Sequence, residues 1–224
     1  MMKYFFLIFF FTYNFCLGQD SLVKTNRYKE DQIYIGTSYI LLNQEINGLK
    51  QNGFSRSFYL GFINDISLNK KGNLAIAFGF GYAYNNQISN LNFYKDEYGS
   101  EKVNINDGIF LETKNKLISN VLEFPIEFRW RTSSFSNYSF WRIYLGYKFG
   151  YKFFNKAKSY YEEKIILRNI SPFSQSITLS LGYNTWNVYL EYGVTNILES
   201  NYDYGLEMPL NLRPIKIGFI FYIL

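Results

Sequence analysis

Four charged side chains recur on one parity of a short segment, LEFPIEFRWR, which spans residues 122–131. Glu123 and Glu127 are followed by Arg129 and Arg131. Two carboxylates at this spacing are the only acid–base pair that the segment offers. The guanidinium groups beside them favour ion pairs over proton transfer. The other parity holds only large apolar residues, namely Leu122, Phe124, Ile126, Phe128 and Trp130.

The reactions open to the chain are narrowed by its composition. It contains no histidine in 224 residues, which excludes every mechanism that uses imidazole as base, acid or metal ligand. The only cysteine, Cys16, lies in an amino-terminal segment that we expect to be removed, so the mature chain would have no disulfide or thiol chemistry. We therefore predict a protein that is not an enzyme and that has no cofactor, no metal, no small-molecule substrate and no nucleic-acid partner.

The charged segment is one of several with period-two alternation. One face of these segments is bulky throughout, and the other is built from Gly, Ala, Ser and charged residues. Small residues are typical of the narrow lumen of an eight-stranded barrel, and the bulky face would then contact lipid. The pattern predicts an all-β fold, an eight-stranded antiparallel up-and-down transmembrane β-barrel over residues 32–224; a soluble sandwich is the alternative. The predicted strands are 32–42, 55–63, 73–85, 118–131, 140–153, 173–184, 187–195 and 213–224.

Composition and the chain ends support export to the outer membrane. Aromatic residues make up 21% of the chain, as expected for the aromatic girdles of such barrels. Residues 1–19 have the features of a signal peptide, with Lys3 before an apolar run and cleavage after Gly18 or Gln19. Residues 20–31 would form a short periplasmic lead. The segment KIGFIFYI, at 216–223, is typical of a final barrel strand. The predicted location is the outer membrane of a Gram-negative bacterium.

The connections between the predicted strands alternate in length. Short or moderate turns are expected at 64–72, 132–139 and 184–186, and such turns lie in the periplasm. Longer loops would face the exterior. Pro125 lacks a backbone N–H for the ladder, so we expect a bulge or local kink there. The long loops are 43–52, 89–112, 156–172 and 199–212.

Charged residues cluster on the parity that would face the lumen. They could form ion pairs that fill the lumen, or the excess of cations could bind an acidic group of a partner. Arg56 and Arg213 have the outward parity beside external loops, where lipopolysaccharide phosphates lie, although a rim arginine can also reach water without binding a specific lipid. The inward set is Glu123, Glu127, Arg129, Arg131, Arg142, Lys148, Lys152, Glu191 and Lys216.

Several blocks of the sequence resemble the PorT family of outer-membrane β-barrels. The resemblance implies a non-enzymatic accessory or assembly role in the type IX protein secretion system, which also serves gliding motility, with other secretion-system proteins as partners. It implies no catalytic residue. The blocks are LNKKGNLAIAFGFGYAYN, LEFPIEFRWRTS, FWRIYLGYKFGY, LGYNTW and LRPIKIGFIFYIL.

Three other functions are open to a barrel of this kind. A solute pore would need an open lumen, whereas Tyr34, Tyr59, Tyr144 and Tyr189 are expected to fill it. A lipid-modifying enzyme would need a mechanism based on carboxylates or lysine. A small structural or adhesin-like barrel with no secretion role would act through its external loops, and deletion of residues 90–112 would test this function.

Overall fold

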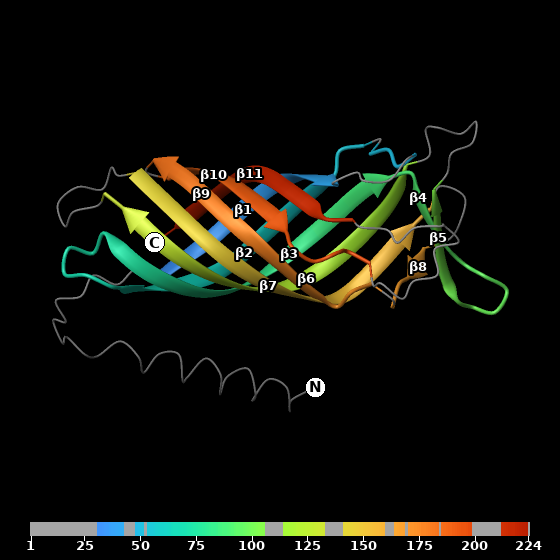
Figure 1. Cartoon of the computed structure of the whole chain (residues 1–224), viewed down its shortest axis with the longest axis horizontal. Helices are drawn as coiled ribbons and strands as arrows, with labels where there is room; N and C mark the ends of the chain where they lie inside the picture. Colours follow the sequence, from blue (N-terminus) through green and yellow to red (C-terminus); the bar gives the residue numbers. More distant parts are fainter. Residues whose placement is uncertain are drawn as a thin grey trace, which may run out of the picture.

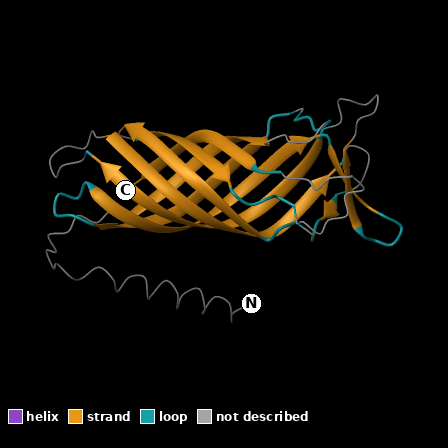
Figure 2. Ribbon diagram, viewed as in Figure 1, coloured by secondary structure: helices purple, strands orange, loops and turns teal. Residues whose placement is uncertain are grey.

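The structure is a computed structural model and describes residues 31–42, 48–51, 53–105, 114–132, 141–159, 164–168, 170–183, 185–198 and 212–223. The predicted signal peptide and residues 20–30 of the predicted lead lie outside these residues. The described chain is a long barrel with a smaller group of strands at one end (Figures 1 and 2). In the described part, no helix is long and apolar enough to cross a membrane.

Eight strands close the barrel, and each is antiparallel to its neighbours. The β1–β11 ladder completes the circle and runs from Ile33↔Ile223 to Leu42↔Pro214. The predicted fold class is confirmed. The strands are β1 (Asp31–Leu42), β2 (Arg56–Ser67), β3 (Leu74–Ser89), β6 (Asn115–Arg131), β7 (Trp141–Lys158), β9 (Phe173–Tyr183), β10 (Trp186–Gly193) and β11 (Pro214–Ile223).

The two faces of the barrel wall have the predicted chemistry. The large apolar residues of the bulky parity are exposed; Phe128, for example, keeps 48% of its surface. The inward parity is buried, and its glycines make room for tyrosines. A methyl group at Gly36 would overlap the Tyr59 ring, and one at Gly81 would overlap the Tyr34 hydroxyl. The apolar face therefore covers the outside of the barrel, where lipid replaces water.

The first turn was predicted to begin at residue 64, which is too early in the chain. Strand β2 continues to Ser67, and the turn is closed by a hydrogen bond from the Leu68 N–H to the Leu74 carbonyl (2.8 Å). The polar pair Asn64 and Asp65 suggested a turn, but the two residues continue the alternation of the strand. Asp65 therefore has the inward parity and is completely buried.

Strands at the opposite end of the barrel extend beyond the predicted limits. Strands β3, β6 and β7 each extend three or more residues beyond the predicted strands 73–85, 118–131 and 140–153. The predicted loop 89–112 contains a hairpin, formed by β4 (Leu91–Lys95) and β5 (Glu101–Ile105). A further short strand, β8 (Ile165–Ile166), pairs with β7. Since long connections face the exterior in such barrels, this end is the extracellular one.

The extracellular end has an apolar core of its own, which we call the cap. Its buried side chains come from the hairpin, from the ends of barrel strands and from the connecting segments, and Ile105 and Ile165 pack against them. The cap is therefore a small, conventional hydrophobic core above the barrel. Its buried residues are Leu42, Leu49, Leu91, Phe93, Val103, Leu117, Ala157, Leu167, Ile170, Ile197, Leu198 and Leu212.

The irregularity expected at Pro125 lies elsewhere. The β6–β7 register shifts between Asn120, which pairs with Phe154, and Val121, which pairs with Lys152. Phe153 is thus the extra residue of a β-bulge. The β3–β6 register is the same on both sides of Pro125, and its ring packs against Gly79, where a side chain would leave no room. A small neighbour accommodates the proline without a bulge.

Candidate functional site

Near the periplasmic turns, two arginines and two carboxylates form a buried group that we call the arginine cluster: Asp65, Glu127, Arg129 and Arg131. Arg131 Nη1 lies 2.7 Å from Asp65 Oδ2, and Arg129 Nη2 lies 2.9 Å from Glu127 Oε2. Arg129 Nη1 is 3.7 Å from the same Asp65 oxygen. The cluster has two positive and two negative groups, so its formal charge balances.

The arginine cluster is held by neutral partners as well. Arg129 Nη1 donates a hydrogen bond to Gln32 Oε1 (3.0 Å), and Arg131 Nε donates to the carbonyl of Gly72 in the first turn (2.8 Å). Gly72 has a φ of 71°, which glycine adopts without the steric cost that a side chain would add. The cluster therefore ties β1, β2 and β6 to a periplasmic turn.

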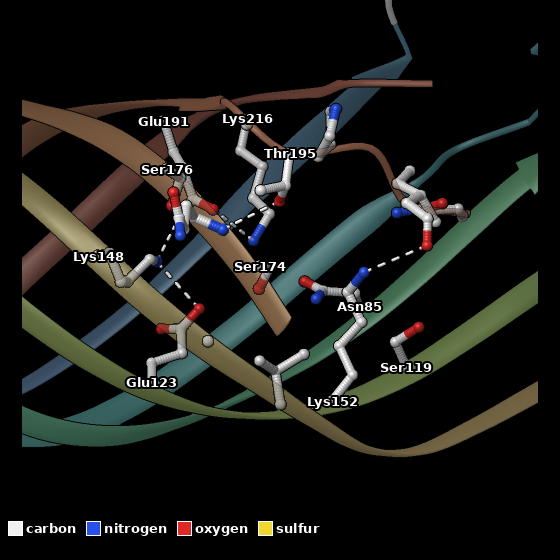
Figure 3. Close-up of a pocket in the computed structure, with 17 residues that line it drawn as sticks. Asn85, Ser119, Glu123, Lys148, Lys152, Ser174, Ser176, Glu191, Thr195 and Lys216 are labelled. Carbon is white, nitrogen blue, oxygen red and sulfur yellow. Dashed lines mark hydrogen bonds and ion pairs between the residues drawn. The ribbon is translucent and has the colours of Figure 1, made fainter. Parts of the chain in front are cut away.

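A second buried group, the lysine cluster, lies farther toward the extracellular end: Glu123, Lys148, Glu191 and Lys216 (Figure 3). Lys148 Nζ lies 2.9 Å from Glu123 Oε1 and 2.6 Å from Glu191 Oε2. Lys216 Nζ lies 2.9 Å from Glu191 Oε1. Glu191 thus bridges two lysines from different strands, and this cluster is also balanced in charge.

Tyrosines pack against both clusters. The Arg129 guanidinium carbon lies 4.5 Å from the centroid of the Tyr144 ring and 5.1 Å from that of Tyr222. Lys148 Nζ lies 5.6 Å from the Tyr59 centroid, and it donates a hydrogen bond to the Tyr189 hydroxyl (3.0 Å). Ring faces attract cations most strongly where water is excluded. All four predicted lumen tyrosines, Tyr34 included, are buried.

A polar cavity lies on the extracellular side of the lysine cluster. Its walls include Asn85, Ser119, Ser174 and Thr195 (Figure 3). The centre of a water molecule can occupy about 40 Å³ of it. Since one water needs roughly 10–15 Å³ measured in this way, the cavity has room for a few waters. Ile197, which also lines it, belongs to the cap.

Two of the predicted lumen residues lie outside these clusters. Arg142 is buried beside Arg131, its register partner across the β6–β7 ladder. Lys152 lines the polar cavity and its ammonium group donates to the carbonyl of Ile197 (3.4 Å).

The two predicted rim arginines, Arg56 and Arg213, are both exposed near the extracellular end, and the Arg56 guanidinium carbon lies 5.8 Å from the centroid of the Phe58 ring. Their contact with lipopolysaccharide stays a prediction.

Two members of the buried network were missed in the sequence. Asp65 was assigned to a turn, and Gln32 was not considered because it is neutral. The signal for Asp65 was its parity, which it shares with Ser57, Tyr59 and Ile63. Once Asp65 is included, each cation of the two clusters has a carboxylate within 3.0 Å. The geometry therefore favours internal ion pairs over a site for a partner's acidic group.

Comparison with known proteins agrees with this architecture. Residues 18–206 match the family described as the outer membrane protein beta-barrel domain. The chain belongs to this family. It is accordingly an outer membrane protein, and its exposed apolar wall faces the lipid of that membrane. No curated protein matches the chain in sequence.

Solved structures of Ail, the attachment invasion locus protein of Yersinia pestis, are similar to this barrel. One, in complex with the heparin analogue sucrose octasulfate, is 11% identical with a TM-score of 0.40, and covers 87% of this chain and 97% of that chain. A second Ail crystal structure, with the same coverages, is 12% identical with a TM-score of 0.38. The backbone structure in a phospholipid bilayer nanodisc is 15% identical with a TM-score of 0.31, and covers 87% of this chain and 100% of that chain.

In the described residues, no group of three or more His, Cys, Asp or Glu side chains could hold a metal ion. The carboxylates of the two clusters are engaged by lysine or arginine at ion-pair distance. The arrangement can hold eight strands in register across a membrane. The two cavities beside the lysine cluster have room for only a few waters.

Proposed function

We propose that the protein is a non-enzymatic accessory or assembly component of the type IX protein secretion system, required for secretion and for gliding motility where the two are linked. The family-specific sequence blocks suggest this role. The observation that carries the proposal is the filled interior, in which two ion clusters, tyrosines and the cap follow one another along the barrel. A barrel filled in this way would act through its outer surfaces.

Among the described residues, two surfaces are available for contacts with secretion-system proteins. The periplasmic turn after β2 presents Lys70 and Lys71, which are both exposed. The cap presents the tip of the β4–β5 hairpin, where Tyr98 keeps 93% of its surface. The proposal does not require the lumen to open, and it predicts that contact residues lie on one or both of these surfaces.

The test is deletion of the gene, followed by comparison of the secreted proteins. We expect the loss of proteins exported by the type IX system, and recovery when the full chain is restored. Two complementing variants then locate the contact surface: Lys70→Ser with Lys71→Ser, and a hairpin with residues 96–100 replaced by Asn-Gly. An unchanged set of secreted proteins in the deletion strain would contradict the proposed role.

A second candidate is an adhesin-like barrel without a secretion role, for which the ordered hairpin is the supporting observation. The hairpin variant distinguishes the two functions. Loss of surface attachment with normal secretion would favour an adhesin, whereas loss of secretion with normal attachment would favour the accessory role. A stable open level in single-channel recordings of the purified protein would instead favour a pore.

A further inference from the structure

Five lysines gather on the outer surface of the barrel near its extracellular end, and we call them the outer lysine patch: Lys114, Lys116, Lys156, Lys158 and Lys164. The β6–β7 register places Lys116 directly opposite Lys158. The β7–β8 register, Lys156↔Ile166 and Ala157↔Ile165, places Lys164 on the other side of Lys158 when continued by one residue. Three lysines therefore stand side by side across three neighbouring segments.

The direction of these side chains follows from their neighbours. Leu117, Ala157 and Ile165 form the adjacent row of the same ladder, and all three pack in the cap. Since successive side chains of a strand point to opposite faces, the lysines on either side of this row point away from the cap. Lys114, Lys158 and Lys164 are exposed, and Lys116 and Lys156 are partly exposed.

The height of the patch coincides with the edge of the apolar wall. On β7 the outward residues are apolar or aromatic from Trp141 to Phe154, and Lys156 and Lys158 follow. Fourteen residues at about 3.3 Å each and a tilt of about 40° span roughly 35 Å along the barrel axis, more than the apolar band of about 25 Å. The lysines therefore lie at the level of the outer-leaflet headgroups.

The patch has no balancing charge among the residues that the structure describes. Among the residues that the structure describes, no carboxylate forms an ion pair with any of the five lysines. Like charges directly opposite each other destabilise an antiparallel pair, because their Cβ atoms are about 5 Å apart. A bound anion would remove this repulsion. The exposed side chains of Phe153 and Phe154 lie immediately below Lys156 on β7, and exposed Ile166 lies beside it.

We propose that the outer lysine patch binds the phosphate groups of a lipid A-type glycolipid of the outer leaflet. The ammonium groups would contact the phosphates, and the apolar side chains below would contact the acyl chains. A cationic patch above an apolar strip fits an amphiphile that carries its phosphates at the membrane surface. This lipid would occupy the β6–β7 side of the barrel, whereas Arg56 and Arg213 lie on β2 and next to β11.

The test compares lipid retention by two triple variants in detergent, measured by native mass spectrometry after incubation with purified lipid A. One variant carries Lys116→Ser, Lys156→Ser and Lys158→Ser. The matched control removes three lysines from elsewhere, with Lys70→Ser, Lys71→Ser and Lys95→Ser. Because each lysine near an anionic surface contributes about a fivefold change in binding, we expect the first variant to lose affinity on the order of a hundredfold. The control should bind as the original protein does.

Three further measurements separate the possible ligands. Dephosphorylated lipid A should bind the original protein as weakly as lipid A binds the patch variant. Phosphatidylglycerol and inorganic phosphate should displace lipid A poorly. Heat-dependent migration in gels checks folding, and removal of like charges should leave the unfolding temperature equal or higher. Equal retention of lipid A by both triple variants, or equal binding of phosphatidylglycerol, would overturn the proposal.

Discussion

The lumen of the barrel and the cap above it are both closely packed, but with opposite kinds of side chain. In the lumen, buried Arg129, Arg131 and Lys148 are held by carboxylates and tyrosine rings. In the cap, the buried side chains are aliphatic or aromatic. The outer surfaces show the opposite arrangement. The surface around the lumen is apolar, and the surface around the cap carries lysines.

The change takes place within single strands. On β7, Lys148 points inward while Phe149 and Tyr151 point outward; beyond the bulge at Phe153, Ala157 points inward and Lys158 outward. Lipid surrounds the first part and water the second, so each part buries the groups that its own surroundings disfavour. The difference shows that one continuous strand can obey both rules, and β6 does so without an extra residue, with Leu117 inward in the cap and Glu123 inward in the lumen.

The largest loss of stability is expected from Asp65→Ala in the lumen. The substitution leaves Arg131 without its carboxylate at 2.7 Å and Arg129 without its second one, and breaking a buried pair in this way costs about 3–5 kcal/mol. Urea unfolding in detergent micelles measures the loss. The exposed carboxylate Glu97 is the matched control, and Glu97→Ala should change the stability by about 0.5 kcal/mol or less. Equal midpoints for the two variants would contradict a stabilising arginine cluster.

The next largest loss of stability is expected from Phe93→Ala, and it should be confined to the cap. Phe93 is 3% exposed, and truncation of a buried phenylalanine costs about 3–5 kcal/mol where the whole side chain is packed. Here we expect the loss to appear as local opening, with faster amide hydrogen exchange at Val103 on β5. The urea midpoint of the barrel should stay unchanged. A parallel fall in barrel stability would mean that the lumen and the cap unfold together rather than as separate units.

The barrel could be predicted from the sequence because lipid on one side and a narrow lumen on the other impose a strict alternation. Glu123, Glu127, Arg129 and Glu191 were placed inward on parity alone, and all four are buried. The pairing among them could not be predicted, because strand tilt decides which inward residues meet across the lumen. Glu191, for example, meets Lys148 of β7, which is not its neighbour in the sheet.

The cap could not be predicted, because its pattern is the inverse of the barrel's. Leu91 and Phe93 alternate with polar residues over only five positions, and Val103 and Ile105 do the same in β5. Such short runs give a weak signal. The bulge at Phe153 also shifts the parity of β7, so the strand was predicted to end there. The signal that was available is the presence of these two alternating runs, β4 and β5, within one long external connection.

The smallest loss of stability is expected from substitutions at the tip of the β4–β5 hairpin. It tests whether the cap opens separately from the barrel. Gly99 has a φ of 79°, and a methyl group there would meet no other atom within 4 Å. Gly99→Ala should therefore cost only the backbone strain of a left-handed residue, about 1–2 kcal/mol, and Gly99→Asn should cost less because asparagine tolerates this conformation. Hydrogen exchange at Val103 should rise in that order, while the urea midpoint of the barrel stays fixed. Since Asp96 Oδ1 still accepts the Tyr98 and Ser100 N–H groups, the turn itself should be kept in both variants. Equal exchange in Gly99→Ala and Gly99→Asn would show that the hairpin tip does not limit the opening of the cap.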